Sequence, residues 1–214
     1  MMTVTIIGRW KTFTAFAVGI AGALFLEGCS GSEVETYNKF EFSFEYPGKV
    51  DVVERGTPLF GKKASHEAGN LRIGTTSDLT DGKVEAIFMV AWFPAQQADR
   101  AEVMKIVGAA LKGRQQGHDL HLGGKVELDQ EGHRVWGARF CTQGKEGILL
   151  NVAGAWYCDV SKRIFHLTSA ARWENPTFIM SGSGAGPEWP DAKKDSSFKA
   201  YEKLLRSFHC HLAK

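Results

Sequence analysis

The chain has 214 residues, 43% of them hydrophobic and 11% aromatic, enough apolar surface for a folded core, which excludes a largely disordered protein. Its 26 lysines and arginines nearly balance 24 aspartates and glutamates, which argues against a nucleic-acid-binding protein and against a polybasic membrane-surface domain. After subtraction of a removable N-terminal segment, the length corresponds to about one domain.

The N-terminal 28 residues have the pattern of an export signal. Arg9 and Lys11 precede an uncharged apolar stretch at 12–26, which has the length of a signal-peptide core and is short for a membrane span. The following Leu26-Glu27-Gly28-Cys29 resembles the lipobox of bacterial lipoproteins, although Glu27 departs from the small or uncharged residue usual there. The resemblance implies cleavage before Cys29 and lipid, such as palmitate, on its thiol. The alternative is that 12–26 remains as an uncleaved anchor helix.

Both readings place the domain outside the cytoplasm, held to the cell membrane or outer membrane and facing the periplasm or exterior. Ser30 after the cysteine implies the outer membrane under the enterobacterial sorting rule. We expect a signal peptide at 1–28, a lipidated tether at 29–37 and one folded domain at 38–214.

The first half of this domain is predicted to consist of strands and then a helix. Aromatic residues alternate with polar ones over 40–46, which is typical of a half-buried strand. Further strands are expected at 50–54, 71–76 and 84–93, with a turn at Asp81-Gly82 between the last two. Asp99 and Glu102 have the spacing of a capping box and predict a helix at 99–112.

The second half is predicted to form an antiparallel meander and a closing helix. Strands are expected at 125–129, 133–142, 147–158 and 163–171, because only short connections separate them. Residues 174–194 contain many breakers and are predicted to be a long loop. Apolar residues at helical spacing over 198–208 predict a last helix, with Asp195, Ser196 or Ser197 as its N-cap.

This order of elements indicates an α+β fold, with an antiparallel sheet and flanking helices. The segment Phe42-Ser43-Phe44-Glu45-Tyr46-Pro47, the mid-chain helix after Phe93-Pro94, and the closing Leu204-Leu205-Arg206-Ser207-Phe208 resemble the PsbP/DcrB-like family over most of 38–210. The resemblance implies an α-β-α sandwich, a noncatalytic binding or assembly role, and no cofactor.

Three cysteines remain in the domain when Cys29 carries lipid. If 143–146 is a hairpin tip, Cys141 lies opposite a residue near Leu149, so Cys158 is too far along its strand to bridge it. A closing helix that runs back along 163–171 would bring Cys210 beside Cys158. We therefore predict a Cys158–Cys210 disulfide and a buried or reactive Cys141, the alternative being three reduced cysteines.

Two further sets of residues are candidates for function. His209, Cys210 and His211 offer transition-metal ligands, which His118 and His121 could join if the fold brought them together. Trp173 and Trp189 flank the predicted loop, where they could form a partner-binding rim or pin the loop down. The sequence favours a lipid-anchored, noncatalytic envelope protein that binds an envelope partner; the alternative is a metal-binding protein or enzyme using the C-terminal cluster.

Overall fold

The computed structural model describes residues 33–57, 61–115, 119–144, 147–174, 176, 178–181, 184–191 and 194–212. The predicted signal peptide and Cys29 therefore lie outside the described residues. Among the residues that are described, no helix has both the length and the hydropathy needed to cross a membrane.

The described part of the chain is built on a seven-stranded sheet in which every neighbouring pair is antiparallel. Across the sheet, the strands follow the order β3 (Val52–Arg55), β4 (Gly69–Ile73), β5 (Ile87–Pro94), β9 (Arg163–Arg172), β8 (Gly147–Cys158), β7 (His133–Gly144) and β6 (Asp119–Gln130). The strands from β6 to β9 are neighbours in chain order, which confirms the predicted meander.

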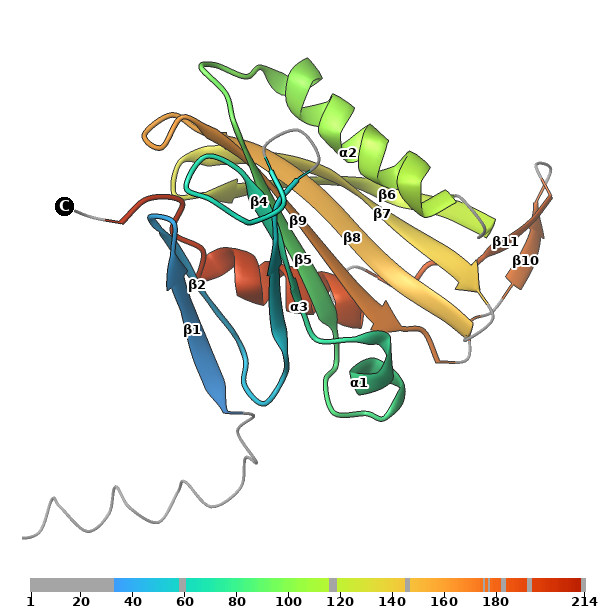
Figure 1. The fold of residues 1–214 in the computed structure, drawn as a ribbon. Coiled ribbons are helices and arrows are strands. Elements are labelled where there is room, and N and C mark those ends of the chain that lie inside the picture. The colour runs from blue at the N-terminus through green and yellow to red at the C-terminus, as the bar shows by residue number, and fades with distance from the viewer. Residues whose placement is uncertain are drawn as a thin grey trace, which may run out of the picture. The chain divides into compact units, whose positions relative to one another are not determined.

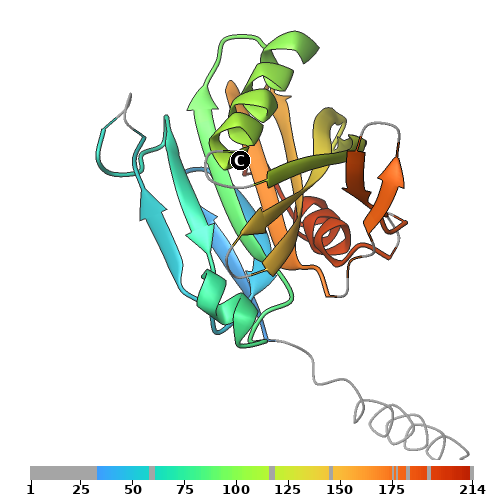
Figure 2. The ribbon, with the colours of Figure 1, turned by 90° about the vertical axis from the view of Figure 1, so that its right-hand side faces the viewer.

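Helices cover both faces of this sheet, as Figures 1 and 2 show. Helix α2 (Arg100–Gln115) packs mainly on β7 and β8. Helix α3 (Ser196–Arg206) lies on the other face over β8 and β9, beside the hairpin of β1 (Val34–Lys39) and β2 (Phe42–Pro47). The fold is therefore α+β with the predicted α-β-α arrangement.

The larger core lies between the sheet, α3 and the β1–β2 hairpin. Phe208, just after α3, packs against Phe42, Phe44 and Trp156, with ring centroids 5.0–5.6 Å apart. Such aromatic pairs add about 0.5–1.5 kcal/mol each beyond the area they bury. The aromatic stripe of the predicted first strand is thus the main contact of the hairpin with the core.

A buried arginine also fastens this hairpin to the sheet. Arg163, at the start of β9, is 2% exposed and lies over the rings of Phe42 and Phe165. Its Nη1 donates to the carbonyl oxygens of Phe40, at 2.7 Å, and His66, at 3.0 Å. The turn between β1 and β2 is therefore held by a charged donor as well as by apolar packing.

The expected tether at 29–37 and the strand at 40–46 need correction. Residues 34–39 form β1 and pair with β2, so the folded domain begins before residue 38. Phe40 and Glu41 have φ of 54° and 62° and make the turn between the two strands, the conformation favoured in two-residue hairpins. The strand predicted to start at Phe40 accordingly starts at Phe42.

Two other segments contain structure that the sequence did not predict. The expected turn at 81–82 follows a short helix, α1 (Thr76–Thr80), whose N-cap Thr75 forms a capping box with Asp78. The expected loop at 174–194 contains the antiparallel strands β10 (Phe178–Ser181) and β11 (Gly184–Pro187). In both places, local hydrogen bonds organise a segment whose composition indicates a loop.

Candidate functional site

The predicted disulfide is present at one end of the sheet. Cys158, the last residue of β8, is bonded to Cys210, and their Cα atoms are 6.4 Å apart. Both side chains are buried, at 0% and 1% exposure. Cys141 is the free cysteine among the described residues, and burial raises the pKa of its thiol to about 11. Of the two predicted states of Cys141, buried or reactive, the structure therefore shows the buried one, with a thiol of low reactivity.

Two histidines complete a cluster with this disulfide. Nδ1 of His211 lies 3.4 Å from Sγ of Cys210 and 3.7 Å from Sγ of Cys158. His133, at the start of β7, is the fourth member, and one potential ligand atom from each residue lies within 4.8 Å of the others. These residues could hold a metal ion only if the cysteines were reduced, because disulfide sulfurs are not thiolates.

The expected metal set of His209, Cys210 and His211 is only partly brought together. Nδ1 of His209 pairs instead with Oε1 of Glu131, and the His209 backbone pairs with Ser43. His121 is on β6, where it pairs with Cys141 of β7. It is about 30 Å along β6 from the end of the strand that pairs with His133. His118 lies outside the described residues.

Trp173 and Trp189 lie together, with ring centroids 5.7 Å apart. Both are partly buried, and Trp189 also lies against Gly123 of β6, where any Cβ would collide with its ring. Arg139 approaches the Trp189 ring at 5.6 Å. These contacts hold the segment before α3 against the sheet. Of the two roles predicted for the tryptophans, they agree with the one in which the rings hold this segment in place.

A buried ion pair supports the same segment. Nη2 and Nε of Arg139 lie 2.8 and 2.9 Å from Oδ2 of Asp195, and Nη2 also donates to the carbonyl oxygen of Pro190 at 2.8 Å. The other carboxylate oxygen of Asp195 caps α3 by accepting from the backbone N–H of Phe198 at 3.0 Å. One carboxylate therefore fixes both the start of α3 and the chain that leads to it.

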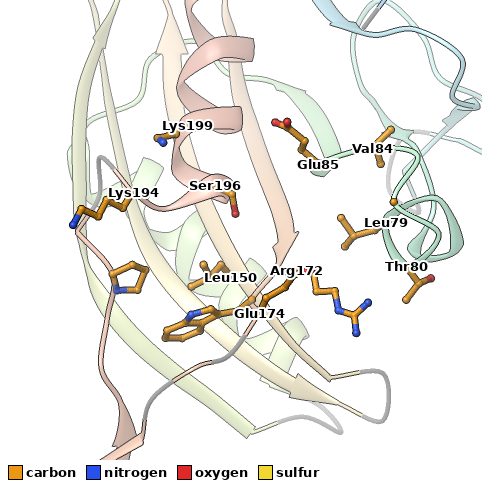
Figure 3. Close-up of a pocket in the computed structure, with 13 residues that line it drawn as sticks. Leu79, Thr80, Val84, Glu85, Leu150, Arg172, Glu174, Lys194, Ser196 and Lys199 are labelled. Carbon is orange, nitrogen blue, oxygen red and sulfur yellow. The ribbon is translucent and has the colours of Figure 1, made fainter. Parts of the chain in front are cut away.

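Trp173 lines an open pocket of about 720 Å³, shown in Figure 3. One side is formed by α1 and the residues after it, and the opposite side by α3 and the residues before it. Leu79 and Val84 on the α1 side and Leu150 on β8 are buried and supply apolar lining. The volume is within the range of ligand pockets, and more than half of the lining residues are polar or charged.

Five charged side chains also line the pocket, three of them cationic and two anionic. Arg172, Lys194 and Lys199 contribute positive charge, whereas Glu85 and Glu174 contribute negative charge. All five are exposed, so the rim carries a net positive charge at the surface. A pocket with some buried apolar lining and an excess of cations at its rim can bind a group that carries both an apolar surface and negative charge.

Sequence reasoning found Trp173 but missed the rest of the pocket. Its residues come from four separate stretches of chain that only the fold brings together. Asp195 was among the expected N-caps, but nothing in the sequence pairs it with Arg139. The glycine pair at 123–124 on β6 could have indicated the close approach of Trp189, since glycine in a strand often marks a close approach, but it gives no signal for the pocket.

No family model and no curated protein matches the chain. Among solved structures, cyanobacterial PsbP (CyanoP) from Synechocystis sp. PCC 6803 matches with a TM-score of 0.50 and 10% identity, covering 86% of this chain and 98% of that one. The domain has a PsbP-like fold. A Pseudomonas aeruginosa protein of unknown function also matches, with a TM-score of 0.33 and 14% identity over 65% of this chain and 83% of that one.

Proposed function

We propose that the protein is a lipid-anchored cell-envelope protein whose PsbP-like domain is a noncatalytic binding module. We further propose that the pocket beside Trp173 receives an acidic segment of an envelope protein. The observation that carries this proposal is the excess of cations on the pocket rim, where Arg172, Lys194 and Lys199 outnumber two glutamates, beside buried apolar lining residues. Charge complementarity of this kind steers a partner and sets its register.

Two observations support the envelope location. The lipobox-like Leu26-Glu27-Gly28-Cys29 provides a site for lipid. The buried Cys158–Cys210 disulfide suits an oxidising compartment, because cytoplasmic reductants keep most thiols reduced. Intact-mass spectrometry of the membrane-purified protein tests the anchor: a chain that begins at an acylated Cys29 is expected, and a full-length, unacylated chain would contradict it.

The contacts that hold the segment next to the pocket support a binding role. Trp173 and Trp189 pack on each other, and the Arg139–Asp195 pair holds the start of α3. A preformed pocket loses little conformational entropy on binding, which leaves more of the contact energy for affinity.

Site-specific photo-crosslinking in the organism that makes the protein tests the partner proposal. A photoreactive residue at Lys199 of the full chain should give a discrete protein adduct, whereas one at Lys105, which is exposed on α2 on the other face of the sheet, should not. Charge reversal by Arg172→Glu should reduce the Lys199 adduct, and Lys112→Glu on α2 should leave it unchanged. Equal adducts from both positions, or a Lys199 adduct insensitive to Arg172→Glu, would refute a partner site in the pocket.

A further inference from the structure

The cluster of His133, Cys158, Cys210 and His211 has the composition of a Cys₂His₂ metal site. Two parts of the fold bring it together. Strands β7 and β8 pair as far as Trp136–Ala155, and His133 and Cys158 lie three residues beyond that pair, each at an end of its strand. The chain after α3 brings Cys210 and His211 to the same end of the sheet. One potential ligand atom from each of the four residues lies within 4.8 Å of the others, so His133 and Cys158 can reach a common ion.

The distances suit zinc once the sulfur–sulfur bond is absent. With Zn–S bonds of about 2.3 Å and Zn–N bonds of about 2.0–2.1 Å, tetrahedral geometry places ligand atoms about 3.3–3.8 Å apart. His211 already lies at 3.4 and 3.7 Å from the two sulfurs. All four potential ligand atoms lie within 4.8 Å of one another, so the site needs mainly a separation of the two sulfurs.

The surroundings favour a metal with thiolate ligands. Cys158 and Cys210 are buried in the large core, and His133 has only 13% of its side chain exposed. A buried thiolate is costly without a cation, and a bound Zn²⁺ supplies that charge. The carboxylate of Asp159 lies 3.8 Å from Nδ1 of His133, which places a further negative charge beside the cluster.

We propose that this cluster is a redox-controlled Zn²⁺ site: the disulfide closes it, and reduction opens it. A dithiol reductant gives two electrons and two protons to the Cys158–Cys210 bond and itself becomes a disulfide, leaving two thiols. Zn²⁺ then displaces both thiol protons and binds the two thiolates with His133 and His211. This goes beyond the proposed binding role and does not depend on the pocket.

Zinc in this site would hold the same two parts of the chain that the disulfide holds. Cys158 is on β8 and Cys210 follows α3, so either link fastens the C-terminal segment to the sheet. A structural zinc contributes directly to folding free energy, as a cross-link does. The domain would therefore keep its C-terminal contact in both oxidising and reducing conditions.

The test compares zinc binding by oxidised and reduced full-length chains carrying Cys29→Ser. A phosphine reduces the disulfide, with water supplying the oxygen of the phosphine oxide, and offers no thiolate to the metal. After gel filtration under argon, the reduced chain should retain one zinc per chain and the oxidised chain none. Co²⁺ in place of Zn²⁺ should give the thiolate charge-transfer absorption of a tetrahedral site.

Histidine variants identify the ligands and leave the disulfide intact for a folding check. His133→Gln and His211→Gln should each weaken zinc binding at least about tenfold in the reduced chain. His209→Gln, next to the cluster but paired with Glu131, and Cys141→Ser should bind as the parent does. Near-UV circular dichroism of the oxidised variants verifies that they are folded.

Several results would overturn the proposal. These are retention of no zinc by the reduced chain, equal retention by the oxidised chain, or wild-type affinity in either His133→Gln or His211→Gln. Unfolding of the chain on reduction, without recovery on addition of Zn²⁺, would also overturn it.

Discussion

The buried ion pair of Arg139 and Asp195 allows a direct test of how the pocket wall is held. Their side chains are only 11% and 1% exposed. Arg139→Met removes the charge while keeping a long apolar side chain, and it leaves the Asp195 carboxylate buried without its cation. The free energy of unfolding should therefore fall.

The expected loss is about 3–5 kcal/mol, the usual cost of removing one partner from a buried ion pair. The cap of α3 through Phe198 can persist, because it uses the other oxygen of Asp195, so the cap's own contribution of about 1 kcal/mol is retained. Asp195→Asn should also lower the free energy of unfolding, because it leaves the Arg139 charge buried and without its anion. The double variant should be less destabilised than the sum of the two single variants, because neither charge is then left alone.

Urea unfolding followed by tryptophan fluorescence measures these free energies. The matched control is the exposed pair of Arg206 and Glu202 on α3, whose side chains are 75% and 35% exposed. Glu202→Gln there should cost less than about 0.5 kcal/mol, as is typical of surface pairs. A loss below about 1 kcal/mol for Arg139→Met, or strict additivity in the double variant, would refute the reasoning.

Three other changes should have measurable effects on stability. Tyr201→Phe should raise the free energy of unfolding by about 1 kcal/mol, because the buried hydroxyl has no hydrogen-bond partner among the described residues; a decrease in urea unfolding would contradict this. Replacing Cys158 and Cys210 by alanine should cost about 4 kcal/mol in unfolding without reductant, since the cross-link closes a loop of sequence separation 52. Because burial raises the pKa of Cys141 from 9.0 to about 11, its unfolded thiol loses a proton first. The free energy of unfolding should therefore fall by about 2 kcal/mol as pH rises from 9 to 11, and Cys141→Ala should not show that part of the decline in urea unfolding.

The sequence predicted best the elements whose pattern is local. Strand β8 lies where 147–158 was predicted, β9 extends the predicted 163–171 by one residue, and α3 follows a predicted N-cap, Asp195. Each has clear apolar periodicity and ends at turn residues. These elements also carry most of the core, so the fold class could be predicted from them.

The elements that were missed depend on partners elsewhere in the chain. Strand β1 has only one buried residue, Tyr37, so it shows no apolar alternation and is stabilised by pairing with β2. The short β10 and β11 likewise pair mainly with each other. The pocket could not be predicted because α1, β9 and α3, which contribute to it, are brought together only by the tertiary fold.

The outcome for the cysteines shows what a sequence argument can place. A hairpin tip at 143–146 was expected to put Cys141 opposite a residue near Leu149, and the structure pairs it with Leu150. The disulfide prediction required only that Cys158 and Cys210 reach the same end of the sheet. The cluster with His133 depends on finer detail, because a one-residue slip in strand register reverses the face of every side chain on a strand. A sequence argument can therefore place a cross-link between the ends of two elements, while a four-residue ligand set requires the strand pairing to be known to the residue.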